Sequence, residues 1–281
     1  ILKRRFVLSS IKIGKLEISN NAPLVFIAGP CAIESKAHSL SMAHNLKKIS
    51  TELGVGLIFK SSFDKANRTS VKSKRGVGLD ASLDIFAAIK EETDLPILTD
   101  VHEPEQCNIV KDYVDVLQIP AFLARQTDLI LAAANTQKPV NIKKSQFMSP
   151  WDIKYSAEKI LSQSNTNICL TERGYSFGYN NLVVDFRSIE VMKKLDFPII
   201  FDATHSVQLP GGGESSGGQK EFIEALSTAA VSIGVSAVFA EVHNNPPAAI
   251  SDGDNQLNLD EFHLLAKKLI QFDMIAKNFK S

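Results

Sequence analysis

The sequence predicts a single α/β domain over residues 1–281, a closed (β/α)8 TIM barrel with an N-terminal β-hairpin. Two observations predict it. Short runs rich in Val, Ile, Leu and Phe recur along the chain, and segments of helical periodicity separate most of them. Charged or polar residues follow nearly all of these runs, at the positions where barrel enzymes carry their active sites.

The first expected element is the hairpin, over about residues 8–20. Residues 10–18 alternate apolar and polar side chains on either side of Gly14 and Lys15. Alternation around a short turn that contains glycine is typical of two antiparallel strands. We therefore expect the chain to enter the barrel through a hairpin.

Eight apolar runs follow, each long enough for a buried strand. They are residues 24–28, 57–60, 97–100, 116–119, 140–143, 168–171, 199–202 and 237–241. Apolar residues at helical spacing occupy residues 39–53, 83–89, 128–135, 151–161, 188–195, 220–233 and 257–270. No low-complexity linker divides this pattern, so one domain is expected.

One stretch, residues 210–219, is rich in Gly and Ser and follows the seventh predicted strand. The loops after barrel strands build the active face, so this stretch is expected to be a lid over a ligand. An ordinary surface loop is the alternative.

Composition excludes several classes of partner. Lys plus Arg and Asp plus Glu both number 31, so no net field attracts nucleic acid or a membrane surface. Cys31, Cys107 and Cys169 have no CxxC spacing, which argues against a disulfide framework and favours a reducing compartment. No apolar run approaches the roughly 20 residues of a membrane span, and the basic N-terminus lacks the apolar core of a signal peptide. The expected location is the cytoplasm.

Cations at the strand ends indicate an anionic ligand. Five of them are expected to meet at the mouth of the barrel: Lys60, Lys65, Arg68, Lys143 and Arg173. They would repel one another unless anions neutralise them, and the arginine fork suits phosphate or carboxylate. A polyanionic ligand, or two phosphorylated ligands, is therefore predicted, although any single lysine also suits a solvated loop. No P-loop or GxGxxG follows a strand, so nucleotide binding is not indicated.

A metal site is the second candidate. In a closed barrel the eighth strand lies between the seventh and the first, which places Cys31, His205 and Glu241 in adjacent sectors. Asp252 lies on the loop after the eighth strand. A thiolate, an imidazole and carboxylates suit a divalent ion such as zinc, iron or manganese. Cys31 also fits a small buried apolar position, His205 fits a hydrogen-bonded core histidine, and His243 is a rival ligand that spacing does not exclude.

Four blocks of the sequence resemble those of the 3-deoxy-D-manno-octulosonate 8-phosphate synthases. They are FKSSFDKANRTS (59–70), QIPAFLARQTD (118–128), TERGYSFGYNN (171–181) and FDATHSVQ (201–208). The likeness extends over nearly the whole chain. It implies a homotetrameric barrel enzyme that condenses phosphoenolpyruvate, arabinose 5-phosphate and water, in the synthesis of octulosonate for lipopolysaccharide or a similar glycan.

The resemblance also implies roles for individual residues. Those implied for phosphoenolpyruvate are Lys60, Lys65, Gln118, Ala121, Lys143 and Arg173, and those for arabinose 5-phosphate are Asn67, Arg68, Thr69 and Asp100. Arg125 would reach the sugar phosphate of a neighbouring subunit. The implied catalytic residues are Lys60, Lys65, Asp100 and His205.

The family contains metal-dependent members, with cysteine after Gly-Pro, and metal-independent members, with asparagine there. Gly29-Pro30-Cys31 resembles the first group, and that group's four metal ligands match Cys31, His205, Glu241 and Asp252. Residues 251–254 depart from the usual pattern of either group.

Two alternatives remain at this stage. The sister enzyme, 3-deoxy-D-arabino-heptulosonate 7-phosphate synthase, uses erythrose 4-phosphate and has Lys-Pro-Arg-Thr where this chain has residues 66–69, Ala-Asn-Arg-Thr. Asn67 suits the hydroxyls of the longer sugar. A non-catalytic barrel that binds sugar phosphates would be expected to have lost cations or ligands from its mouth, and none is missing here.

Overall fold

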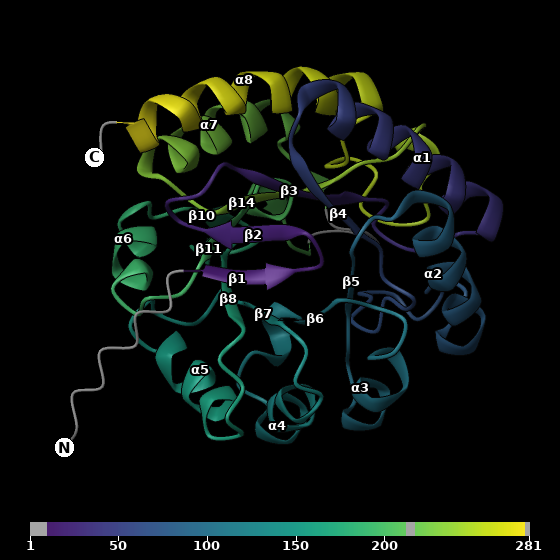
Figure 1. The fold of residues 1–281 in the computed structure, drawn as a ribbon, viewed down its shortest axis with the longest axis horizontal. Helices are drawn as coiled ribbons and strands as arrows, with labels where there is room; N and C mark the ends of the chain where they lie inside the picture. The colour runs from purple at the N-terminus through teal and green to yellow at the C-terminus, as the bar shows by residue number, and fades with distance from the viewer. Residues whose placement is uncertain (1–9, 212–216, 279–281) are drawn as a thin grey trace.

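The computed structural model describes residues 10–211 and 217–278. Its centre is a closed barrel of eight parallel strands in the order β11-β14-β3-β4-β5-β6-β7-β8 (Figure 1). The strands are β3 Val25–Gly29, β4 Gly56–Lys60, β5 Ile97–Asp100, β6 Val116–Ile119, β7 Val140–Lys143, β8 Ile168–Glu172, β11 Ile199–Asp202 and β14 Ala237–Glu241. The predicted barrel is confirmed, and β14 pairs with both β11 and β3 as expected.

Helices surround the barrel (Figure 1). They are α1 Lys36–Leu53, α2 Leu79–Thr93, α3 Pro104–Val110, α4 Thr127–Asn135, α5 Ile153–Leu161, α6 Arg187–Lys193, α7 Ile223–Ile233 and α8 Leu259–Asn278. A continuous layer of buried apolar side chains fills the space between helices and strands. In the described ranges, none of the helices combines the length and apolarity that spanning a membrane requires.

Helix α3 was not predicted, because its 7 residues are too few to establish a periodic pattern. Local signals mark it nevertheless. Pro104 occupies the first turn, where proline's missing N–H costs nothing, and the N–H of Glu103 donates to Oε1 of Gln106 at 3.2 Å. A search for caps, rather than for periodicity, would have found this helix.

Other helix boundaries differ from the prediction at the caps. Helix α1 begins at Lys36 rather than at residue 39, because the side chain of Ser35 accepts a hydrogen bond from the N–H of His38. Helix α8 begins at Leu259 rather than at residue 257, because Leu257 forms an isolated bridge with Val242. That bridge closes the base of the loop that follows β14.

Short irregular elements lie at the carboxyl end of the barrel. Strand β9 (Tyr175–Ser176) pairs with β10 (Leu182–Val183), and β12 (Gln208–Leu209) pairs with β13 (Gly217–Gly218). Single turns of 3-10 helix are η1 Ala121–Leu123, η2 His205–Val207, η3 Lys220–Phe222 and η4 Pro246–Ala248. Residues 212–216 of the predicted lid lie outside the described residues.

The predicted hairpin is confirmed as β1 (Ser10–Ile13) and β2 (Leu16–Ser19), while residues 8 and 9 lie outside the described residues. Figure 1 shows it across one end of the barrel. Its Ile11, Ile13 and Ile18 are buried together with side chains of the barrel interior. Lys15 pairs with Asp94 just before β5, so the hairpin covers the amino ends of the strands.

Candidate active site

A cavity of about 610 Å³ opens at the carboxyl end of the barrel. Most of the predicted site residues line it: Lys60, Lys65, Asn67, Arg68, Thr69, Asp100, Gln118, Ala121, Lys143, Arg173, His205 and Asp252. All five cations expected from the sequence therefore face one space. Arg125 does not line this cavity; it is exposed on the segment before α4.

The floor of the cavity holds a buried network of opposite charges. The Nζ of Lys60 donates to the carbonyl oxygen of Cys31 at 3.3 Å, and it lies 3.9 Å from Asp100 and 3.6 Å from Glu241. Burial raises the pKa of Asp100, but Lys60, the His102 hydrogen bond and Lys65 together hold that pKa well below its usual range. Asp100 is therefore ionised, and Lys60 is held between two carboxylates.

Arg173 supplies an unused donor to the same floor. Its Nη2 donates to the carbonyl oxygen of His205 at 3.3 Å and to Oε1 of Gln208 at 2.9 Å. Its Nη1 is buried and has no hydrogen-bond partner among the described residues. A buried guanidinium N–H without an acceptor is costly, and a bound carboxylate or phosphate would satisfy it.

The predicted metal ligands meet at the wall of the cavity, which His205 and Asp252 line. The Sγ of Cys31 and carboxylate oxygens of Glu241 and Asp252 all lie within 4.8 Å of one another. His205 is not a member of that group of three, but its Nε2 lies 3.5 Å from Oε1 of Glu241. Burial, and then the charge of Glu241, raise the pKa of the Cys31 thiol well above its usual value.

These residues fit a divalent ion. Both carboxylate oxygens of Glu241 are buried and accept no hydrogen bond from any described group. Lys60 and Lys65 lie 3.6 and 3.8 Å from Oε1 of Glu241, but neither donates a hydrogen bond to it, so a metal ion would supply the direct contact that these buried oxygens lack. Thiolate, imidazole and carboxylate together are a donor set that zinc, iron and manganese accept.

The sequence profile of the DAHP synthetase I family matches residues 7–278. The chain is also 54% identical, over 270 residues, to proteins named 2-dehydro-3-deoxyphosphooctonate aldolase from Brucella anthropi, Brucella canis and Brucella melitensis. Each alignment covers 96% of this chain and 98% of the relative. The chain belongs to the DAHP synthetase I family.

In this DAHP synthetase I family member, Asp202 was missed as a site residue, although it ends the seventh predicted strand. Its side chain is fully buried, and its Oδ2 lies 2.5 Å from Nζ of Lys143 and 2.9 Å from Nδ1 of His205. Burial raises the pKa of Asp202, but His205 and Lys143 outweigh it and hold that pKa well below the usual range. The carboxylate therefore keeps the proton of His205 on Nδ1 and leaves Nε2 free to face Glu241.

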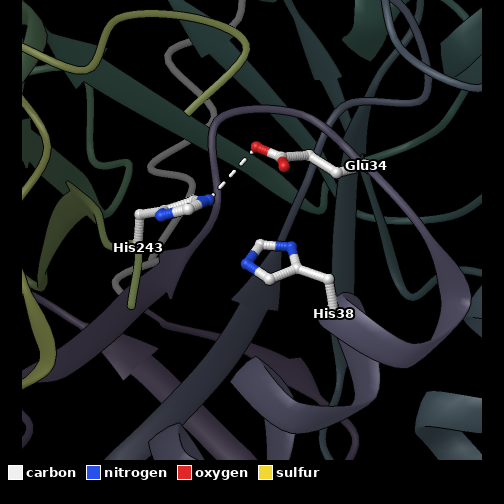
Figure 2. A group of neighbouring side chains, drawn as sticks. All are labelled: Glu34, His38 and His243. Atoms are coloured by element: carbon white, nitrogen blue, oxygen red, sulfur yellow. Dashed lines mark hydrogen bonds and ion pairs between the residues drawn. The ribbon is translucent and has the colours of Figure 1, made fainter. Parts of the chain in front are cut away.

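His243, the rival ligand in the sequence, lies outside the Cys31 group. Figure 2 shows it beside Glu34 and His38. Its Nε2 lies 3.1 Å from Oε1 of Glu34. The rings of His243 and His38 have centroids 4.5 Å apart. Glu34 lies just before α1 and His38 in its first turn, whereas His243 follows β14, 209 residues after Glu34, so no local spacing signals the cluster.

Proposed function

We propose that this chain condenses phosphoenolpyruvate with D-arabinose 5-phosphate and water, and forms 3-deoxy-D-manno-octulosonate 8-phosphate and phosphate. The observation that carries the proposal is the single cavity in which five cations meet, in a chain with formal net charge +0. The relatives' name, 2-dehydro-3-deoxyphosphooctonate aldolase, supports the same chemistry. It describes an aldol-type reaction that concerns a 3-deoxy eight-carbon keto acid phosphate.

The cavity has a buried and an exposed set of anion-binding groups, which suits two substrates. Lys60, Lys143 and Arg173 are almost fully buried, and they match the carboxylate and phosphate of phosphoenolpyruvate. Asn67 and Thr69 are exposed, and Arg68 beside them is half-buried. The phosphate of the sugar would bind this outer set, so that its aldehyde end reaches inward to the enol carbon.

Carbon three of phosphoenolpyruvate is a weak nucleophile that attacks the aldehyde carbon. Carbon two then becomes cationic and takes up water, and the resulting hemiketal phosphate loses phosphate through cleavage of its C–O bond. We assign Lys60, held by Asp100, as the donor of the proton to the new alkoxide. Lys65 lies beside it, because both lysines pair with Oε1 of Glu241. Gln118 and Ala121 complete the wall, and positioning makes the encounter effectively unimolecular.

The metal ligands we propose are Cys31, His205, Glu241 and Asp252, with zinc, iron or manganese as the ion. When bound, such an ion supplies Lewis acidity toward a carbonyl oxygen or a water molecule. His205 contributes its Nε2, because Asp202 holds the proton on Nδ1.

The acceptor sugar distinguishes this proposal from the sister reaction. The family's description refers to DAHP, the seven-carbon product that is made from erythrose 4-phosphate. The relatives with 54% identity are instead named for the eight-carbon product, and Asn67 suits the hydroxyls of the longer sugar. A comparison of both sugars as acceptors decides between them.

Assembly and location belong to the same proposal. We propose a cytoplasmic homotetramer of one-domain chains in which Arg125 reaches the sugar phosphate of a neighbouring subunit. Its exposure, away from the cavity of its own chain, supports this role. Light scattering tests the tetramer. If Arg125→Ala leaves the KM for arabinose 5-phosphate unchanged, the role of Arg125 is refuted.

Phosphate release from phosphoenolpyruvate and arabinose 5-phosphate tests the reaction, with and without dipicolinate and with Mn²⁺ or Zn²⁺ added back. We expect chelation to abolish release and metal to restore it. Undiminished release under chelation would support the synthase reaction and contradict a requirement for metal. Cys31→Asn sharpens the result, because activity that survives chelation in the variant as well as in the parent would show that the metal is not essential.

A further inference from the structure

The cluster in Figure 2 ties the start of α1 to the loop after β14. Oε1 of Glu34 lies 3.1 Å from Nε2 of His243 and also accepts the N–H of Ile250 at 3.2 Å. His38 lies 2.9 Å from the side-chain oxygen of Asn244, through its Nε2. One carboxylate oxygen thus joins both sides of the loop to the body of the barrel.

The hydrogen bonds of His243 decide between two interpretations of this cluster. Two histidines and a carboxylate also form a common metal-binding set, and their ligand atoms lie within 4.8 Å of one another. However, Nδ1 of His243 accepts the backbone N–H of Asn245 at 2.9 Å, so the proton of the neutral ring is on Nε2. That proton points at Glu34 and occupies the nitrogen that a metal would need.

The loop segment that Glu34 holds carries groups of the active site. The carbonyl oxygen of Ile250 accepts Nη2 of Arg68 at 3.0 Å, and Oγ of Ser251 accepts Nη1 at 2.6 Å. Ser251 in turn donates to Oδ2 of Asp252 at 2.5 Å. Asp252 has a φ of 51°, a left-handed conformation that needs support from its surroundings.

We propose that Glu34 is a positioning residue that holds residues 250–252, and through them sets the guanidinium of Arg68 and the carboxylate of Asp252 together. The inference rests on the proposed function, in which Arg68 binds the sugar phosphate and Asp252 binds the metal. Glu34 touches neither substrate nor metal. Its effect passes through Ile250 to Arg68, and along the backbone through Ser251 to Asp252.

The experiment compares Glu34→Ala with Glu34→Gln. Glutamine keeps an acceptor oxygen for both N–H groups, and its amide replaces Oε2 of a side chain that is 22% exposed. Glu34→Ala is expected to raise the KM for arabinose 5-phosphate roughly tenfold with little change in the KM for phosphoenolpyruvate, and to raise the dissociation constant for Co²⁺. Glu34→Gln is expected to remain within about threefold of the parent in both.

Glu52→Ala is the matched control, because Glu52 makes a Glu–His contact at 3.2 Å with His263 between α1 and α8, away from the cavity. It should change neither constant. If Glu34→Ala leaves both constants unchanged, or if Glu34→Gln is as defective as Glu34→Ala, the positioning role is overturned.

Co²⁺ binding also tests the metal interpretation and separates this inference from the proposed function. If the parent binds two Co²⁺ ions and both Glu34→Gln and His38→Asn lose one, the cluster is a metal site and the proposal is wrong. If the parent releases no phosphate with either sugar, the proposed function fails. The sulfur-to-cobalt absorption at Cys31 then still decides the inference, because weaker binding in Glu34→Ala but not in Glu34→Gln upholds it.

Discussion

The two ends of the barrel are built from the same eight strands but have opposite chemistry. At the amino end, Ile11, Ile13 and Ile18 of the hairpin are buried against apolar side chains of the interior. At the carboxyl end, the interior contains buried ions: Lys60, Asp100, Lys143, Asp202 and Glu241. Phe239 marks the boundary, since it belongs to the apolar cluster while Nζ of Lys143 lies 4.4 Å from its ring centroid.

This difference separates stability from function within one fold. Burial of apolar area at the amino end stabilises the chain. Ionised groups at the carboxyl end are expensive to bury and are retained where a ligand needs them. Changes at the amino end should therefore lower stability and spare the kinetics of folded protein. Changes to the ligand-facing groups at the carboxyl end should impair the kinetics more than they lower stability.

The largest expected effect is that of Arg173→Lys at the carboxyl end. Lysine keeps the charge but loses the fork that presents the unpartnered Nη1, so kcat/KM for phosphoenolpyruvate should fall about 100- to 1,000-fold. The free energy of unfolding in urea should change by less than about 1 kcal/mol. Arg187→Lys, at an exposed arginine paired with Asp185, is the control. A large loss of stability in Arg173→Lys would contradict the separation.

Ile18→Ala tests the amino end. Ile18 is fully buried in the hairpin, so truncation should lower the free energy of unfolding by about 2–5 kcal/mol. Steady-state kinetics, measured well below the unfolding temperature, should stay within about twofold of the parent. Ile109→Ala removes a 42% exposed side chain and should cost far less. A tenfold fall in kcat for Ile18→Ala would show that the two ends are coupled.

Asp202→Asn tests whether the buried carboxylate of Asp202 orients the metal ligand His205. Loss of the carboxylate beside Nδ1 of His205 should weaken Co²⁺ binding about 10- to 100-fold, as measured by competition with a coloured chelator. Asp115→Asn is the matched control, because Asp115 pairs with Lys90 at 2.9 Å near the amino ends of the strands. Equal metal affinities in both variants would show that Asp202 does not support metal binding.

The smallest expected effect is in acid. Asp100 and Asp202 have pKa values held below that of an unfolded aspartate, which is about 3.9. Their contributions to stability are thus complete above about pH 4 and are lost as the pH falls toward the folded pKa values. Each should add a slope of about 1.4 kcal/mol per pH unit below about pH 4. Denaturation at several acidic pH values should show a shallower slope for Asp202→Asn, while Ile18→Ala should lower the whole curve without changing its slope.

Much of the fold was predictable, because buried parallel strands and amphipathic helices leave separate patterns in the sequence. All eight barrel strands were found, and β5, β6, β7, β11 and β14 match to the residue. Helix α3 and the start of α1 were not found, since caps rather than periodicity define them. The hairpin was predicted, but its place across the amino end depends on contacts with residues far along the chain.

The candidate site was predictable to the extent that a strand end locates a side chain. Lys60, Asp100, Lys143, Arg173 and Glu241 directly end or follow strands, and the closed barrel brings them together. The hydrogen-bond partners that position these side chains and fix their protonation were not predictable from strand ends. Glu34 and Ile250 are separated by 216 residues, and the hydrogen bond between them depends on how two loops pack.

By itself, the sequence determined the barrel, the family resemblance and the set of chemical groups at the mouth, because these depend on residue type and on the period of the strands. Only the tertiary structure decided that His205, rather than His243, lies beside Glu241, and that His243 turns to Glu34. It also decided that Asp202 joins Lys143 to His205. The physical reason is that a hydrogen bond depends on distances of a few tenths of an ångström between atoms from separate loops, and no local pattern encodes those distances.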